Sequence, residues 1–335
     1  MRVWDRACSE GIAKLAVWLC GHVTAEVAEQ ILNQIGGVVC SDTSIWRRVE
    51  KWGEKIKALE AVRQAAANAL PARGSVVSGV RQLSKDMGTS MDGIKINVRK
   101  EGWKELKVGC VFDIEVRPEL DAKTEEVVEH AHAVNNSYTA YLGEPTPFGR
   151  ALWAEACRRE MPHARDSVVL GDGAPWIWNL AGEHFASSHQ VVDWYHATEH
   201  LYKAAHLAFG EGSAEAIRWA KGMETPLYQG HAWRVSSVLR ELAKRHRRVA
   251  KELRAEAGYF EHNQRRMQYL EMREEGFPIG SGMVESGGKQ FRARLAGAGM
   301  RWSRDMVERL IPVRAAILSH RFDDLWRVAY NSPRK

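Results

Sequence analysis

Three short glycine-containing segments of the chain each offer one carboxylate, in a setting that a solvated acid would not need. Asp92 precedes a glycine in a strand-like run, and Asp172 lies between two glycines after the apolar residues 168–170. Glu285 follows the glycine-rich turn 280–282 and opens a strongly basic segment. Carboxylate oxygens are the ligands that hard divalent cations prefer, and two such cations can clamp a phosphodiester during in-line displacement. If the three acids converge, they suffice to hold two Mg²⁺ or Mn²⁺ ions.

Each acid taken alone has a simpler explanation. Asp-Gly is a common turn pair, and Glu285 by itself is typical of an exposed helix residue. Asp92 differs from a turn residue because Ile94 and Ile96 continue the strand pattern beyond it. Asp172 differs because the following Gly-Ala-Pro-Trp is typical of a helix start rather than of a hairpin. The three acids together therefore favour a metal site.

The pattern from residue 90 to residue 193 predicts an α/β fold with a ribonuclease-H-like mixed sheet. Alternating or continuous apolar runs, a hairpin turn at 99–102 and two helix patterns give the order strand, strand, strand, helix, strand, helix, strand. The strands are expected at 91–98, 106–116, 127–138, 167–170 and 190–192, and the helices at 146–160, capped at Thr146, and 174–184. In such a sheet the first and fourth strands are neighbours, so Asp92 and Asp172 converge at one edge.

The remaining segments are predicted to be helical. After Asp193 the period stays helical almost to residue 275, and three further helices are expected at 283–295, 303–319 and 321–330. We therefore expect four regions: a helical DNA-binding region (1–75), the sheet core with the first two acids (88–193), an all-helical insertion (194–278) and C-terminal helices that complete the core (279–330). The Pro-, Gly- and Ser-containing stretch 71–75 marks the first boundary.

Two short helices around Gly36-Gly37 resemble a helix-turn-helix. Thr24 and residues 41–43 can cap them, and the second helix is expected to carry Arg47, Arg48 and Lys51 on its open side. A plain helical hairpin fits the pattern equally well. If the helix-turn-helix interpretation holds, these three basic residues are candidate DNA contacts.

Composition adds a weaker signal for nucleic acid. The chain has 335 residues, a net charge of +6 and a pI near 9.0, with concentrated basic runs at 244–248 and 289–294. Such runs suit phosphate contacts. Four basic residues that follow Glu285 in the sequence are the expected contacts to phosphates near the site of strand cleavage: Lys289, Arg292, Arg294 and Arg301.

The location of the protein is predicted from what the sequence lacks. The five cysteines are dispersed and form no Cys-x-x-Cys pair, which is typical of reduced thiols in a cytosol. The apolar stretch 12–20 is too short to span a bilayer, and no secretory signal is visible at residues 1–6. We expect a cytoplasmic, nucleoid-associated bacterial protein without a membrane partner.

Five blocks of the sequence resemble the signature blocks of bacterial insertion-sequence transposases of the DDE class, of the ISKra type. They are 91–93, 99–109, 171–178, 280–286 and 296–303, they occur in the family order, and the likeness covers roughly residues 20–330. The resemblance implies a ribonuclease-H-like catalytic domain with a helical insertion. It also implies DNA transposition, in which Asp92, Asp172 and Glu285 direct strand cleavage and strand transfer of an insertion sequence. The partners implied are the double-stranded DNA of transposon ends and target, bound by a homo-oligomer.

Two further features bear on the resemblance. Residues 191–196 resemble the Asp-x-x-His element of several DDE groups, in which His196 would approach the scissile phosphate or steady the edge of the active site. A hydrogen-bonded histidine at a helix start explains His196 equally well. Family members have more sequence ahead of the helical hairpin, so we expect an N-terminally truncated copy or a misassigned start.

Two alternatives come from other classes of protein. Residues 196–200 spell His-x-x-Glu-His, an inverted zinc-peptidase motif, for which Glu271 or Glu274 is available as the distant ligand. That interpretation leaves the three acids and the basic runs unexplained. A non-catalytic DNA-binding remnant is the second alternative, and it differs from the enzyme only in whether the acids support cleavage.

Overall fold

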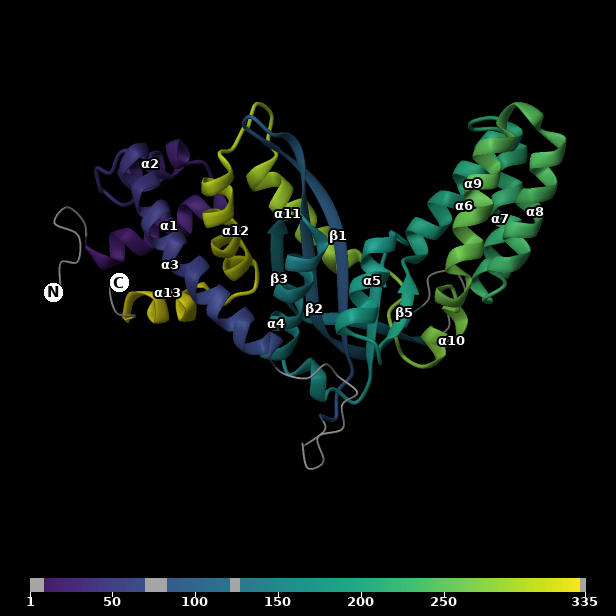
Figure 1. The fold of residues 1–335 in the computed structure, drawn as a ribbon, viewed down its shortest axis with the longest axis horizontal. Helices are drawn as coiled ribbons and strands as arrows, with labels where there is room; N and C mark the ends of the chain where they lie inside the picture. Colours follow the sequence, from purple (N-terminus) through teal and green to yellow (C-terminus); the bar gives the residue numbers. More distant parts are fainter. Residues whose placement is uncertain (1–8, 70–82, 121–126, 332–335) are drawn as a thin grey trace.

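A mixed five-stranded sheet lies at the centre of the molecule, with helical regions on both sides (Figure 1). The computed structural model describes residues 9–69, 83–120 and 127–331. The strand order is β3-β2-β1-β4-β5, with antiparallel pairs β1–β2 and β2–β3 and parallel pairs β1–β4 and β4–β5. The strands are β1 (Met87–Val98), β2 (Gly102–Leu120), β3 (Val127–Leu142), β4 (Ser167–Gly171) and β5 (His189–Val192). The prediction of a mixed α/β protein with five strands in this order of elements is confirmed.

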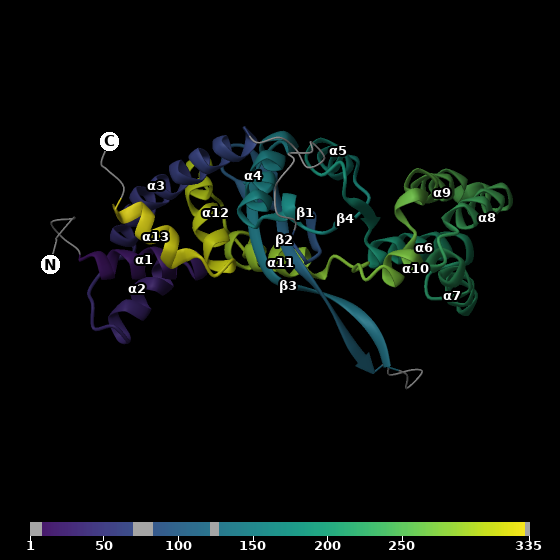
Figure 2. The same ribbon diagram turned by 90° about the horizontal axis from the view of Figure 1, so that it is seen from below.

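The first three strands are longer than predicted. The hairpin turn after β1 is where the sequence placed it, and Lys100 and Gly102 adopt positive φ angles of 67° and 77° there. Beyond the sheet, β2 and β3 continue as a protruding two-stranded arm (Figure 2). The end of β2 is exposed along 115–120, so the arm lacks the alternation of buried and exposed residues on which the prediction depended.

Helices cover both faces of the sheet. Phe148 and Leu152 of α4 (Pro145–Arg158) pack against Gly109 of β2, whereas α11 (Gly282–Leu295) packs on the face that carries Ile94. Because alternate residues of paired strands face opposite sides, these two helices lie on opposite faces. The predicted cap at Thr146 is wrong, since α4 already begins at Pro145 with Glu144 as its N-cap. Helix α5 (Pro175–His184) follows β4 and contacts α4.

The N-terminal helices pack against the end of the chain. They are α1 (Glu10–His22), α2 (Ala25–Gln34) and the single long helix α3 (Asp42–Asn68). The predicted caps are confirmed, since the hydroxyls of Thr24 and Ser41 accept hydrogen bonds from the third residue beyond. Helix α12 (Arg304–Leu318) lies between β3 and α3, and α13 (Phe322–Asn331) packs on α3. The boundary predicted at 71–75 lies outside the described residues.

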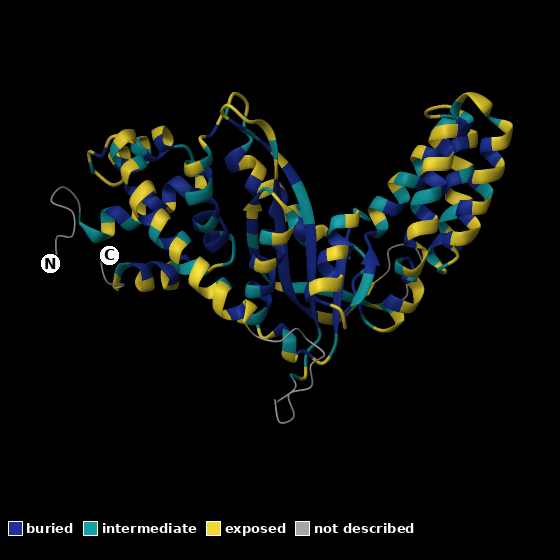
Figure 3. Cartoon of the chain, in the orientation of Figure 1, coloured by how far each residue is buried: buried dark blue, intermediate teal, exposed yellow. Residues whose placement is uncertain are grey.

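A helical bundle projects from the far edge of the sheet, beyond β5 (Figure 1). Buried residues form one stripe along its helices, as expected for amphipathic helices that share a core (Figure 3). Its members are α6 (Trp194–Phe209), α7 (Ala214–Tyr228), α8 (Ala232–Arg245), α9 (Ala250–Asn263) and the short α10 (Tyr269–Glu274). The predicted helical character of 194–275 is confirmed. Among the described helices, none has the length and apolar character needed to cross a membrane.

Candidate metal centre

Asp92 on β1 and Asp172 directly after β4 occupy equivalent positions in the parallel register of these two strands. The parallel register pairs Ser90 of β1 with Leu170 of β4, and each acid lies two residues further along its strand direction. Asp92 Oδ1 accepts a hydrogen bond from the N–H of Gly93 at 2.6 Å. Asp172 Oδ1 accepts one from the N–H of Ala174 at 2.8 Å, which turns the chain into α5. The sheet therefore brings these two carboxylates to the same edge.

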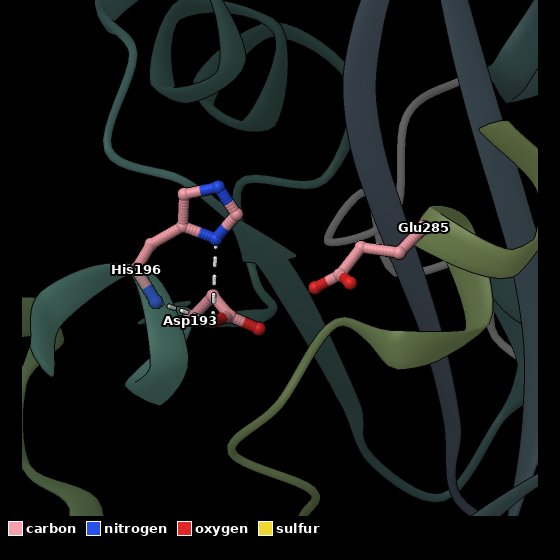
Figure 4. Close-up of side chains that lie close together, drawn as sticks. All are labelled: Asp193, His196 and Glu285. Atoms are coloured by element: carbon pink, nitrogen blue, oxygen red, sulfur yellow. Dashed lines mark hydrogen bonds and ion pairs between the residues drawn. The ribbon is translucent and has the colours of Figure 1, made fainter. Parts of the chain in front are cut away.

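Glu285 lies in the first turn of α11, the helix that packs on the face of the sheet carrying Ile94. One turn later, Gly288 faces β1 so closely that a Cβ atom there would lie 3.5 Å from Asp92 Oδ2 and 3.4 Å from Ile94 Cγ2. These are ordinary van der Waals distances, so α11 packs directly on the part of β1 that carries Asp92. Figure 4 shows the Glu285 side chain reaching from α11 toward the start of α6.

The electrostatics of Asp92 show that the acids act on one another. Burial raises the pKa of the Asp92 carboxyl, and the negative charges of Asp172 and Glu285 raise it further, while the Gly93 N–H and His196 act in the opposite direction. Deprotonated acids gathered in this way are stabilised by a cation. Asp92, Asp172 and Glu285 are thus near enough for their charges to interact, but among the described residues their ligand atoms do not all lie within 4.8 Å of one another.

A second cluster lies directly beside these acids and shares Glu285 with them. Within the described residues, the potential ligand atoms of Asp193, His196 and Glu285 all lie within 4.8 Å of one another (Figure 4). Asp92 and Asp172 do not belong to this compact group. The sequence singled out His196 and Glu285, and it included Asp193 only as the Asp of the Asp-x-x-His element, without a role of its own.

Asp193 holds the site together. Its fully buried side chain caps α6, where Oδ1 accepts a hydrogen bond from the His196 N–H at 2.8 Å and lies 3.4 Å from His196 Nδ1. Oδ2 accepts a hydrogen bond from the N–H of Ser281, just before α11, and the Asp193 N–H donates to Gly171 O at 2.8 Å. Burial alone would raise the pKa of Asp193, but these hydrogen bonds outweigh it, so the pKa lies below its ordinary value. Asp193 thus joins three elements, α6 and the start of α11 through its carboxylate and β4 through its backbone N–H.

His196 is a cation at neutral pH. The hydrogen bond to Asp193 raises the pKa of the imidazole to about 9, against the opposing effect of partial burial. A metal bound at this cluster would therefore have to displace the imidazolium proton, because only the neutral ring has a lone pair to give. About a third of the His196 side chain is exposed, which leaves it accessible to an anionic substrate.

In the described part of the chain, no carboxylate completes a zinc site with His196 and His200, as the zinc-peptidase alternative would require. His200 Nδ1 lies 2.6 Å from Glu256 Oε2, and the imidazole stacks on the Tyr259 ring. Glu271 and Glu274 are exposed on α10 and form no ligand cluster with His196 and His200. The histidines at 196 and 200 are each paired with a carboxylate of their own.

Tyr259 links the helical bundle to the second acid. Its hydroxyl donates to Asp172 O at 3.0 Å across 87 residues of sequence. The next residue, Gly173, has a φ of +101°, and a Cβ there would lie 2.7 Å from Tyr259 Cε2. The sequence offered a signal for Asp193, three residues before His196 at a helix start, but none for Tyr259, which lies within a helix remote in sequence.

The predicted DNA contacts differ in exposure. Arg47, Lys51, Lys289, Arg292 and Arg301 are exposed. Arg48, expected on the open side of α3, is only 7% exposed and donates to Ser44 O, because it lies on the packed side of the helix. Arg294 is 2% exposed, donates to Cys20 O at 2.7 Å and lies over the Trp302 ring. The expectation that Arg48 and Arg294 lie at the surface is therefore wrong.

No protein-family model matches the chain, and no curated protein matches it.

Proposed function

We propose that the chain is a DNA transposase of the DDE class, which cleaves and joins DNA strands by metal-dependent phosphoryl transfer. The observation that carries the proposal is that Asp92 on β1, Asp172 directly after the parallel strand β4 and Glu285 at the start of α11 lie near enough for their charges to interact. Their charges act on one another, as expected of acids that share a cation.

The architecture supports the same proposal. Three antiparallel strands followed by two parallel strands in the order 3-2-1-4-5 are the arrangement expected of a ribonuclease-H-like core. The bundle α6–α10 lies between the second acid and Glu285 in sequence, where the resemblance to insertion-sequence transposases implies a helical insertion.

The residues around the acids have roles that suit a phosphodiester substrate. Divalent cations, when bound by Asp92, Asp172 and Glu285, supply the positive charge that stabilises the transition state of an in-line displacement. His196 adds a protonated group beside the acids. Lys289, one turn beyond Glu285 and exposed, is placed to contact the DNA backbone.

The overall reaction exchanges phosphodiester bonds. In cleavage, water adds to the phosphorus and the 3′ oxygen leaves with a proton, which gives a 5′ phosphate and a 3′ hydroxyl. In strand transfer, that hydroxyl attacks a phosphodiester of the target and displaces its 3′ oxygen. We propose double-stranded DNA as the partner, bound by a homo-oligomer in the bacterial nucleoid.

Nicking of supercoiled plasmid tests the enzymatic proposal. The purified chain is incubated with Mn²⁺ or Mg²⁺, with wild type beside Asp92→Asn and Glu285→Gln, and transfer is followed with DNA fragments taken from both sides of the coding sequence. We expect nicking that requires the cation and falls at least 100-fold in either variant, as for loss of a group that stabilises the transition state.

Matched controls exclude a general effect of lost charge. Asp324→Asn and Glu115→Gln remove exposed acids that are paired with arginines away from the centre, and nicking should continue in both. DNA binding without cleavage in any divalent cation would refute the enzymatic proposal and favour a non-catalytic DNA-binding protein.

A further inference from the structure

A groove of about 360 Å³ lies where the N-terminal helices meet the tip of the β1–β2 hairpin. The segment between α11 and α12 runs beside this tip (Figure 1), since Val98 and Trp302 form a parallel β-bridge and Arg99 Nε donates to Arg301 O at 3.2 Å. The groove is lined by nine residues, among them Trp46, Arg99, Arg294, Arg301, Trp302 and Ser303. Three arginines and no acid are among these residues.

The floor of the groove contains an unneutralised buried charge. Arg294 is 2% exposed, and its Nη1 has no hydrogen-bond partner among the described residues. Its other polar contacts are Cys20 and the face of the Trp302 ring, neither of which carries a full negative charge. Arg314, 7% exposed, is a second buried guanidinium, and burial together with the charge of Arg294 lowers the pKa of Arg314. In the described part of the chain, neither forms an ion pair, although buried charges are normally paired.

The rim of the groove adds positive charge. Arg99 and Arg301 are exposed, and neither forms an ion pair with any described acid. Ser303 is the N-cap of the 15-residue helix α12, but its side chain makes no capping hydrogen bond, so the first N–H groups of this helix remain available beside the groove. Glu26 and Asp305, the acids in the first turns of α2 and α12, do not line the groove.

We propose that this groove is a phosphate-binding site, in which Arg99, Arg301 and the start of α12 hold one backbone phosphate of double-stranded DNA above Arg294. An anion in this position would offset the buried guanidinium and the partial positive charge of the helix end together. The site is separate from the metal centre, so it anchors DNA away from the scissile bond. The identification of the phosphate as DNA rests on the proposed function.

DNA binding measured without divalent cation tests the site independently of catalysis. Fluorescence anisotropy of a labelled duplex, in EDTA and over a series of salt concentrations, compares the full wild-type chain with Arg99→Gln, Arg301→Gln and the double variant. Since both side chains are exposed, the variants should fold. We expect about tenfold weaker binding in the double variant. The salt slope, which is the slope of log K against the logarithm of the salt concentration, should be smaller in magnitude by about 1.

The salt slope also reports how many phosphates are involved. If the two arginines share one phosphate, the slope falls by about the same amount in the double variant as in either single variant. If they contact two separate phosphates, the slope of the double variant falls by about 2. The matched control Arg327→Gln removes an arginine on α13 that pairs with Asp324, and it should change the affinity less than about twofold.

Two outcomes overturn the proposal. A double variant with the affinity and salt slope of wild type would exclude DNA from the groove. If inorganic phosphate then stabilised wild type but not the double variant, the groove would be a site for the free phosphate ion. A slope smaller by about 2 would overturn the single shared phosphate. A chain that binds DNA through the groove but never cleaves it would refute the proposed enzyme without refuting this site.

Discussion

The ion pair between Asp193 and His196 provides the most direct test of the site's geometry. In Asp193→Asn, the carboxylate that raises the pKa of His196 to about 9 is replaced by a neutral amide. We expect the His196 pKa to fall toward its ordinary value of 6.5. The asparagine can still cap α6, because its carbonyl oxygen can accept the His196 N–H. Its amide nitrogen, however, would face the donor N–H of Ser281.

The expected loss of stability in Asp193→Asn follows from the pKa shift of His196 and from the buried hydrogen bond to Ser281. Because the pKa is higher in the folded state, the pair's contribution to stability is complete below pH 6.5 and is lost as the pH rises through about 9. At about 1.36 kcal/mol per unit, the rise corresponds to at most ~3.4 kcal/mol. Since 34% of the His196 side chain is exposed, solvent screening lowers this to about 1–2 kcal/mol. The unpaired Ser281 N–H costs about 1–3 kcal/mol at any pH.

Nuclear magnetic resonance of the histidine side chains measures the pKa directly. The chain contains 13 histidines, and the His196→Gln spectrum identifies the resonance of interest. Urea denaturation at pH 6.5 and pH 9.5 should show the difference between wild type and Asp193→Asn shrinking by about 1–2 kcal/mol at the higher pH. The control Asp166→Asn removes the carboxylate 3.1 Å from His189 Nε2 and should leave the titration of His196 unchanged. A wild-type His196 that titrates near 6.5, unaffected by Asp193→Asn, would refute the reasoning.

Two other substitutions test the packing around the acids. Tyr259→Phe keeps the ring against His200 but removes the hydrogen bond to Asp172 O, so we expect a stability loss of about 1 kcal/mol and a higher Mn²⁺ concentration for half-maximal nicking. Tyr202→Phe, which removes a hydroxyl bonded to Glu224 in the same bundle, is the control, and an equal cation requirement in both variants would contradict the role of Tyr259. Gly287→Ala places a Cβ 2.4 Å from Tyr138 Cε1 and should destabilise the protein by about 1–3 kcal/mol in urea unfolding. Gly288→Ala meets its nearest neighbour only at 3.4 Å and should be neutral or stabilising by up to ~1 kcal/mol, so similar losses at both positions would refute the described approach of α11.

The order of the secondary-structure elements was predictable because local patterns dictate it. The hairpin after Val98, the caps at Thr24 and Ser41, and the helical run after Asp193 each depend on residues close in sequence. The places where prediction was less accurate are those where the local signal is weak. The arm of β2 and β3 lacks alternation at its exposed end, and the proline at 145 starts α4 ahead of the expected cap.

The sequence by itself determined the mixed α/β class and singled out Asp92, Asp172, Glu285 and His196, because residue type and local periodicity carry that information. Only the tertiary structure decided which groups meet. Asp193 joins three elements through its buried carboxylate and its backbone N–H, Tyr259 reaches Asp172 across 87 residues, and Arg294 lies beneath a groove instead of on the surface. Contacts of this kind arise from the packing of elements remote in sequence, and no local pattern of residues encodes them.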